Sequence, residues 1–219
     1  MKKQGILYGI ADRKLGDEKI LEALSSGLDM IQLREKDLTS AEYLRDAMWL
    51  REQTRKSGTL FLVNDRLDIA LACGADGVHL GQSDIPVTAA REITERMGLK
   101  NFIIGATAKT AEQARRACEE GADYLGSGAW YATSTKPDAT LIEDGTYLEI
   151  LKAAPIPNVA IGGLTARNCS RPLQLGAGGI AVAGGIFQAA SVSEAVRAFK
   201  EILERESHER SGNIRSPQK

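Results

Sequence analysis

The sequence predicts a single-domain (β/α)8 TIM barrel of the α/β class. Eight short apolar runs alternate with eight segments of helical periodicity along the 219-residue chain. The composition, 43% apolar and 26% charged, suits one large core without a linker. An open, doubly wound sheet is the alternative, but no G-x-G-x-x-G follows the first strand to favour it.

The apolar runs predict strands that are buried on both faces, as in a covered parallel sheet. The expected strands are 6–10, 30–33, 60–63, 77–80, 102–105, 124–126, 158–161 and 179–182. The apolar positions between them predict amphipathic helices. The expected helices are 18–24, 44–50, 67–72, 87–97, 111–120, 147–152, 166–175 and 192–203.

A repeated turn supports this division into strand–helix units. Gly27, Gly74, Gly121 and Gly176 each close a predicted helix just before a predicted strand. Three of these turns continue to an aspartate, and each interval spans two units. Glycine is the usual residue where a helix ends in the left-handed conformation, so these turns are expected to be structural.

The folded domain is expected to end before the C-terminus of the chain. We expect one domain over 1–204 and a disordered charged tail over 205–219, because Ile214 is the one aliphatic residue of the tail.

Cys73, Cys118 and Cys169 are too far apart in sequence to indicate a disulfide framework, so free thiols in a reducing compartment are expected.

Charge and hydropathy narrow the choice of partners. The net charge of −1 gives no general attraction to nucleic acid or to an anionic membrane. The first apolar run is too short for a signal peptide, and no run is long enough to span a bilayer. A cytoplasmic protein acting on small molecules is expected, and the sequence leaves open whether it is a homo-oligomer.

Asp65 and Asp84 are the first candidate functional residues. Each follows a predicted strand, and those strands are neighbours, so both carboxylates are expected at the barrel mouth, where the strands end. Two carboxylates there could bind Mg²⁺, a cation that prefers oxygen ligands. They could equally cap the helices that follow, a common position for aspartate.

Two further patterns indicate anion binding at the same mouth. Gly162–Gly163 and Gly184–Gly185 follow the last two strands, where this fold commonly binds phosphate through backbone N–H groups, although tight turns would need glycine too. Arg34, Lys36 and Lys136 form a second anion patch if the mouth brings them together. These patterns predict one monophosphate site and one Mg²⁺–diphosphate site.

Other candidates are weaker. His79 lies within a predicted strand, so a hydrogen-bonded position in the barrel is expected, and His208 lies in the tail. Trp130 and Tyr131 could stack on a ring or pack the long loop against the barrel. No spacing indicates a Ser-His-Asp or Cys-His arrangement.

Five motifs, in order along the chain, carry a family resemblance. They are Gln32–Lys36, Asn64–Asp65, His79–Gln82 with Asp84, Thr133–Lys136 and Ile161–Gly163. From about Leu7 to Leu203 the sequence resembles the thiamine phosphate synthase/TenI superfamily, and its thiamine phosphate synthase branch in particular. The resemblance implies a (β/α)8 barrel that joins hydroxymethylpyrimidine diphosphate to a thiazole monophosphate, whose carboxylate form stays open, and releases diphosphate.

The resemblance also implies a role for each matching residue. Asp65 and Asp84 would bind Mg²⁺, and Arg34, Lys36, Thr107 and Lys136 would be catalytic. The substrate-binding residues would be Gln32, Leu33, Arg34, Glu35, Lys36, Asn64, Thr107, Thr133, Ser134, Thr135, Lys136, Gly163, Ala183 and Gly184. The implied mechanism is dissociative: the pyrimidine CH₂–O bond breaks, and the thiazole nitrogen attacks the resulting cation.

Several positions depart from the family pattern. Thr107 replaces a serine, Lys109 stands where many members have histidine, and Gly184 replaces a serine of the thiazole-phosphate turn. Ala129 and Ala132 replace prolines, so the loop after strand 6 is expected to be less rigid. Weaker or altered thiazole binding is expected from these changes.

The sequence leaves three alternative functions open. A TenI-like thiazole tautomerase would need neither diphosphate nor metal, and the Gln32–Lys36 motif with the aspartate pair argues against it. A non-catalytic, thiazole-phosphate-binding regulator would be favoured by loss of Asp65, Asp84 or Lys136, all of which are present. An unrelated phosphate-binding barrel isomerase would make the five motifs coincidental.

Overall fold

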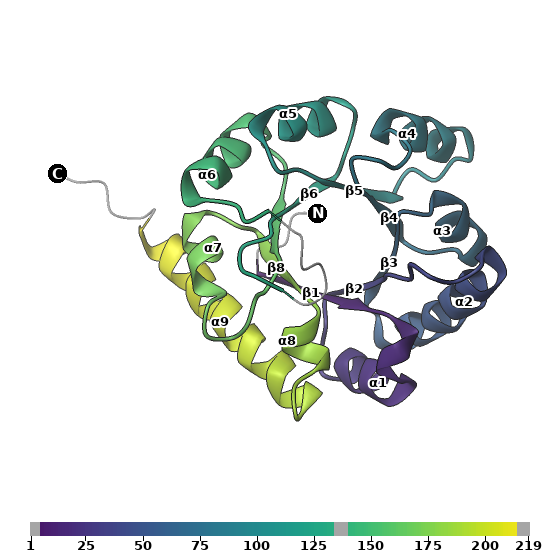
Figure 1. Ribbon diagram of the computed structural model, residues 1–219, viewed down its shortest axis with the longest axis horizontal. Helices are drawn as coiled ribbons and strands as arrows, with labels where there is room; N and C mark the ends of the chain where they lie inside the picture. Colours follow the sequence, from purple (N-terminus) through teal and green to yellow (C-terminus); the bar gives the residue numbers. More distant parts are fainter. Residues whose placement is uncertain (1–4, 134–139, 214–219) are drawn as a thin grey trace.

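A closed barrel of eight parallel strands forms the centre of the molecule (Figure 1). The computed structural model describes residues 5–133 and 140–213. The strands are β1 (Ile6–Ala11), β2 (Met30–Leu33), β3 (Leu60–Asn64), β4 (Gly77–Leu80), β5 (Ile103–Thr107), β6 (Tyr124–Ser127), β7 (Asn158–Ile161) and β8 (Gly179–Val182). Pairing of β1 with β8 closes the barrel, so the TIM-barrel prediction is confirmed and the open sheet is excluded.

The helices form a ring outside the strands (Figure 1). They are η1 (Arg13–Leu15), α1 (Asp17–Ser25), α2 (Ser40–Ser57), α3 (Leu67–Cys73), α4 (Val87–Arg96), α5 (Ala111–Glu119), α6 (Asp144–Ala153), α7 (Ser170–Leu175), α8 (Gly184–Phe187) and α9 (Val192–Asn213). Helix α2 is much longer than its apolar stripe predicted. A capping box between Thr39 and Glu42 begins it, and Gly58 ends it in the left-handed conformation.

The core has two layers, because successive residues of a strand face opposite sides of the sheet. On β1, Leu7 packs in the large cluster between the barrel and the helices, whereas Tyr8 belongs to a smaller cluster inside the barrel. Tyr124 of β6 joins Tyr8 inside. The interior therefore contains polar ring atoms as well as aliphatic groups.

The repeated turns lie at the end of the barrel opposite the mouth. All four helix-ending glycines have positive φ, between 68° and 121°, as expected. The aspartates that follow three of them each accept a backbone N–H bond from a strand and pair with a cation. The sets are Asp29 with Leu7 and Lys200, Asp76 with Phe61 and Arg51, and Asp123 with Ile104 and Arg91. The repeat is therefore structural, because it ties strands to the helix layer.

The last helix continues ten residues beyond its predicted end at Leu203, to Asn213. Glu206 on this extension is buried, and Arg210 donates a 3.0 Å hydrogen bond to the Ala177 carbonyl. These contacts attach the extension to the barrel, which its charged sequence did not indicate. The division between a domain ending at residue 204 and a tail stays a prediction, and residues 214–219 lie outside the described part.

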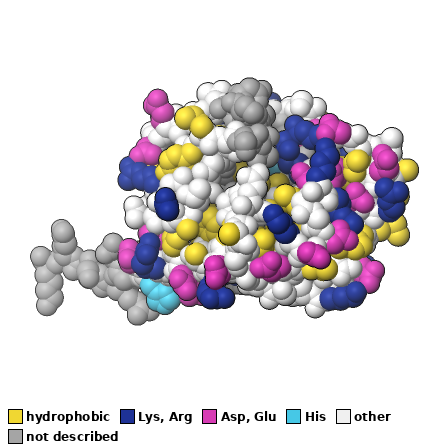
Figure 2. All heavy atoms as spheres, turned by 60° about the horizontal axis from the view of Figure 1, so that its bottom comes forward, with side chains coloured by type: hydrophobic (Ala, Val, Ile, Leu, Met, Phe, Trp, Pro, Cys, Tyr) yellow, Lys and Arg dark blue, Asp and Glu magenta, His cyan; other side chains and the backbone are white. Residues whose placement is uncertain are grey.

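The surface carries charges of both signs. Figure 2 shows Lys and Arg interspersed with Asp and Glu over the face it presents, in line with the small net charge. Within residues 5–133 and 140–213, no helix is long and apolar enough to cross a membrane. All three cysteines are free thiols, as predicted.

Candidate active site at the barrel mouth

Asp65 and Asp84 meet at the ends of two neighbouring strands. Asn64 of β3 lies opposite His79 of β4, and the Asp65 N–H donates a 2.8 Å bond to the His79 carbonyl. Asp65 has φ of 64°, the left-handed region that residues other than glycine seldom adopt. Such backbone conformations gather at functional sites, where the surrounding structure maintains them.

Burial and a neighbouring carboxylate both disfavour the ionised form of Asp65. Burial, and then the hydrogen bond and negative charge of Asp84, raise the pKa of Asp65 to about 6. The positive charges of Arg34 and Lys36 act on Asp65 in the opposite direction. Two carboxylates and two cations from three strand ends therefore lie within electrostatic reach at one point of the mouth.

The helix-cap alternative for these aspartates is wrong. Helix α3 has Arg66 at its N-cap and α4 has Pro86, and neither is capped by a side chain. Asp84 instead accepts a 2.6 Å bond from the Gly81 N–H inside the β4–α4 loop. The pair is therefore available for a role that is not helix capping.

The donor set also suits the magnesium site that the sequence predicts. Among the described residues, no three or more His, Cys, Asp or Glu side chains gather as a metal cluster. Mg²⁺ is commonly bound by only one or two carboxylates, with phosphate oxygens and water completing its octahedron. Two adjacent carboxylates, one with a pKa raised by burial and then by the other, fit such a shared site, because a cation between them would relieve their repulsion.

The Gln32–Lys36 segment divides its side chains among three environments. Gln32 is buried inside the barrel, and Leu33 is fully buried in the outer layer. Glu35 accepts a 2.7 Å bond from the Arg13 N–H, and burial raises the pKa of its carboxyl. Arg34 is half-buried and Lys36 is exposed, so these two present charge at the mouth.

Tyr43 of α2 is a positioning residue that sequence reasoning missed. Its buried hydroxyl lies 2.8 Å from the Leu33 carbonyl and 3.1 Å from the Asn64 carbonyl. It therefore joins the ends of β2 and β3, from which Arg34 and Asp65 emerge. No pattern in the sequence separates this tyrosine from an ordinary core residue, because its role depends on contacts outside its helix.

Asp12 is a second residue that sequence reasoning missed. It follows β1 directly, in the position that Asp65 has after β3, so the same rule could have found it. Its Oδ1 is buried without a hydrogen-bond partner among the described residues. It lines a small cavity together with Arg34 and the Ala183–Gly184 turn. The cavity brings the predicted diphosphate segment beside the predicted thiazole-phosphate turn.

The Gly162–Gly163 turn needs glycine for structural reasons as well. Gly162 has φ of 101° and Gly163 has φ of 64°. A Cβ on Gly163 would lie 2.6 Å from the Tyr131 carbonyl oxygen, so the loop after β6 packs directly on this turn. The tight-turn interpretation is therefore supported, and phosphate binding by these backbone groups stays a prediction.

Thr107 ends β5 at the mouth, half-buried, with its Oγ1 3.0 Å from His79 Nε2. His79 is thus a hydrogen-bonded residue of the barrel, as expected, and His208 lies on α9 with its Nδ1 against the Glu204 carbonyl. Trp130 is buried edge-on against Tyr147, which supports its packing role. The predicted residues Ser134, Thr135 and Lys136 lie outside the described residues, and Thr133 borders them.

Comparison with known proteins decides the family. The family model described as thiamine monophosphate synthase matches residues 7–186. The chain belongs to this family. The thiamine-phosphate synthase of Clostridioides difficile (strain 630) is 45% identical over 204 residues, covering 91% of this chain and 95% of that protein. That of Pyrococcus abyssi (strain GE5 / Orsay) is 41% identical over 200 residues, covering 90% and 94%.

A solved structure from the same family agrees. The thiamine phosphate pyrophosphorylase from Pyrococcus furiosus is 39% identical, superposes with a TM-score of 0.83, and covers 92% of this chain and 96% of that one. The segment matched by the thiamine monophosphate synthase family contains every site residue predicted above. The family match therefore covers the part of the chain that forms the barrel mouth.

Proposed function

We propose that this chain is a transferase of thiamine biosynthesis that joins a pyrimidine diphosphate to a thiazole phosphate, forming thiamine phosphate and releasing diphosphate. The names of its relatives support the reaction. One observation at the mouth supports the chemistry: the Asp65–Asp84 pair lies within electrostatic reach of Arg34 and Lys36. Cations beside paired carboxylates suit a diphosphate that arrives with a divalent metal.

Arg34 and Lys36 are assigned to the departing diphosphate, together with Lys136 from the loop after β6. Arginine offers a planar fork and lysine a point charge, and both match phosphate oxygens. Asp65 and Asp84 are assigned to Mg²⁺, which when bound would neutralise part of the diphosphate charge. Tyr43 keeps the two charged segments at a constant separation through its bonds to β2 and β3.

The reaction breaks the bond between the pyrimidine methylene carbon and the diphosphate oxygen, and the bonding electron pair leaves with diphosphate. The thiazole nitrogen then donates its lone pair to the methylene carbon, which forms the new carbon–nitrogen bond. This chemistry needs no protein nucleophile. The contribution of the chain is to align the two reactants and to stabilise the charge that develops on the diphosphate.

The thiazole phosphate is assigned to Gly163 and the Ala183–Gly184 turn. Glycine lets backbone N–H groups approach phosphate oxygens closely. The cavity shared by Arg34 and Gly184 supports this arrangement, because it joins the two proposed phosphate sites across the end of β1, the strand between β2 and β8. The absence of the family's serine at position 184 removes one hydroxyl donor, so this contact depends on the backbone.

The test is release of diphosphate when both substrates are supplied, with Mg²⁺ and then with EDTA. The wild type is expected to turn over only with metal, and Asp65→Asn to lose at least about tenfold in kcat/KM because one carboxylate is removed from the metal. Asp68→Asn is the matched control, since Asp68 is an exposed neighbour that pairs with Arg66. Metal-independent turnover, or equal loss in the control, would contradict the assignment of the aspartates.

The same samples separate the alternatives. Failure to form thiamine phosphate from both substrates would reject the synthase proposal. Thiazole tautomerisation without metal would indicate a TenI-like enzyme, and binding of the thiazole phosphate without turnover would indicate a regulator.

A further inference from the structure

A chain of hydrogen bonds crosses the interior of the barrel and ends at the mouth. Gln32 Nε2 lies 2.6 Å from the Tyr8 hydroxyl, which lies 3.1 Å from the Tyr124 hydroxyl. The Tyr124 hydroxyl lies 2.9 Å from His79 Nδ1, and His79 Nε2 lies 3.0 Å from Thr107 Oγ1. Five side chains from β2, β1, β6, β4 and β5 thus form one continuous path.

The barrel makes room for this path with two glycines. A Cβ on Gly105 would lie 2.2 Å from the Tyr124 ring, and a Cβ on Gly126 would lie 3.0 Å from the His79 ring. The Tyr124 and His79 rings pack with their centroids 5.6 Å apart. Polar groups inside a barrel cost free energy unless they are paired, so an interior built around this path needs every member paired.

The donor at one end fixes the direction of every bond. Gln32 donates an amide hydrogen to the Tyr8 oxygen, and a hydroxyl has one hydrogen. The buried Tyr8 hydrogen needs an acceptor, and the Tyr124 oxygen is the hydroxyl beside it, so Tyr8 donates to Tyr124 and Tyr124 donates to His79 Nδ1. Because Nδ1 accepts the Tyr124 hydrogen, it carries none of its own, and the His79 ring has one hydrogen left to place. With Nδ1 accepting, that hydrogen is on Nε2 and is donated to Thr107 Oγ1.

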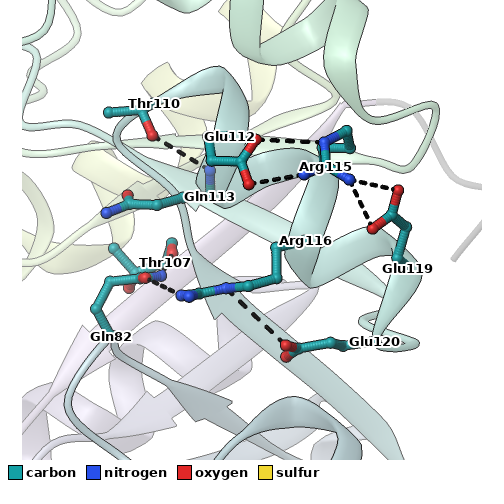
Figure 3. Close-up of polar contacts among 9 residues, drawn as sticks. All are labelled: Gln82, Thr107, Thr110, Glu112, Gln113, Arg115, Arg116, Glu119 and Glu120. Carbon is teal, nitrogen blue, oxygen red and sulfur yellow. Dashed lines mark hydrogen bonds and ion pairs between the residues drawn. The ribbon is translucent and has the colours of Figure 1, made fainter.

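Thr107 is also fixed through its backbone. The Gln82 amide donates a 2.5 Å bond to the Thr107 carbonyl, and Arg116 of α5 donates a 2.7 Å bond to the Gln82 oxygen. Figure 3 shows Gln82 between Thr107 and the Arg116 guanidinium, which also points toward Glu120. Gln82 thus binds the Thr107 carbonyl and His79 binds the Thr107 hydroxyl oxygen. The hydroxyl hydrogen takes part in neither bond.

We infer that His79 is a positioning residue: by donating from Nε2 to Thr107 Oγ1, it leaves the Thr107 hydroxyl as a hydrogen-bond donor toward the substrate in the mouth. The inference rests on the proposed function and on the family resemblance, which implies that Thr107 lies where the family has a serine that contacts the pyrimidine. The recognised group is then an acceptor, such as a ring nitrogen of the heterocycle. The opposite direction of the path would make Thr107 an acceptor only, because its hydrogen would go to His79.

The tautomer of His79 can be measured without substrate. In ¹⁵N-labelled protein at neutral pH, His79 is expected to show a protonated, pyrrole-type Nε2 and an unprotonated, pyridine-type Nδ1. His79 and His208 are the two histidines of the chain, so His208→Gln assigns the signals. Gln32→Glu is expected to reverse the path, because an ionised carboxylate only accepts, and to move the hydrogen to Nδ1. An Nδ1–H tautomer in the wild type would overturn the inference.

Kinetics then test whether the bond matters to the substrate. Thr107→Val removes the hydroxyl and keeps the shape, and it is expected to lower kcat by about tenfold, the order of loss when one hydrogen bond is removed. His79→Asn, which has no donor at the Nε2 position, should cause a similar loss. The double variant should be no worse than either single variant, because both remove one interaction. His79→Gln, which can reach Thr107 with an N–H, should recover most of the rate.

These outcomes distinguish the inference from the proposed function. Additive losses in the double variant, or unchanged kcat in His79→Asn at an unchanged melting temperature, would overturn the positioning role while leaving the synthase proposal intact. If the wild type forms no thiamine phosphate, the proposed function fails, but the tautomer measurement still decides the direction of the path. KM for the thiazole phosphate is expected to stay unchanged in all of these variants, since Thr107 is assigned to the other substrate.

Discussion

Replacing Asp65 with asparagine is expected to stabilise the metal-free protein. The pKa of Asp65 is raised from 3.8 to about 6, by burial first and then by Asp84. At about 1.4 kcal/mol per pKa unit this shift limits the cost of ionising Asp65 to about 3 kcal/mol. Asp65 is only half-buried, so solvent screening reduces the expected gain to about 1 kcal/mol. Asparagine also tolerates the left-handed backbone at this position.

The pH dependence of this gain has a definite sign. Because the folded-state pKa is the higher one, the stability that the carboxyl contributes is fully present below pH 3.8 and is lost as the pH rises through about 6. Asp65→Asn should therefore exceed the wild type in urea unfolding at pH 7.5, and its advantage should fall to less than half at pH 4.5. Asp68→Asn, as the matched control, should show no such pH-dependent gain.

Added Mg²⁺ should reverse the order. Ligand that binds only the folded state adds stability, by about 1.4 kcal/mol at ten times its dissociation constant. The wild type should gain this increment, and Asp65→Asn should gain much less. An Asp65→Asn protein no more stable than the wild type at pH 7.5 would refute the argument that burial and Asp84 together disfavour the ionised form of Asp65. Equal gains from Mg²⁺ in both proteins would refute the metal assignment.

Three other predictions follow from the same geometry. Tyr43→Phe should lower the free energy of unfolding by about 2 kcal/mol, measured in urea, because the one hydroxyl hydrogen that two buried carbonyls share is lost. An unchanged midpoint would contradict this. Gly163→Ala should lower the melting temperature by about 5 °C, since its Cβ meets the Tyr131 carbonyl and its φ is positive; calorimetry that detects no shift would reject the proposed close packing. Burial lowers the pKa of His79 from 6.5 to about 4. As the pH falls, the unfolded state therefore binds a proton at this histidine before the folded state does. The free energy of unfolding of the wild type should therefore fall by up to about 3 kcal/mol relative to that of His79→Gln as the pH is lowered from 6.5 to 4. Parallel curves of unfolding free energy against pH would contradict the burial of His79.

Part of the candidate site can be predicted from the sequence, because it consists of residues that follow strands. Asp65 and Asp84 are predicted from their positions after neighbouring strands, because parallel strands of a closed barrel all end at the same mouth, whereas Thr107 enters through the family resemblance. The same rule, applied to the first strand, points to Asp12, which was overlooked. The helix-cap alternative for the aspartates failed because the chain turns to the left-handed conformation at Asp65, and α3 and α4 begin only after Arg66 and Pro86.

The sequence by itself determined the barrel, because continuous apolar runs and helical periodicity are local patterns that can be counted along the chain. Only the tertiary structure decided which polar groups meet. Tyr8 and Tyr124 are 116 positions apart and yet share a hydrogen bond, and Tyr43 joins two strand ends from a helix. The raised pKa of Asp65 likewise comes from burial and from a carboxylate on another strand. Hydrogen bonds and charge interactions act over a few ångströms, so the fold must first bring distant residues together before these interactions exist.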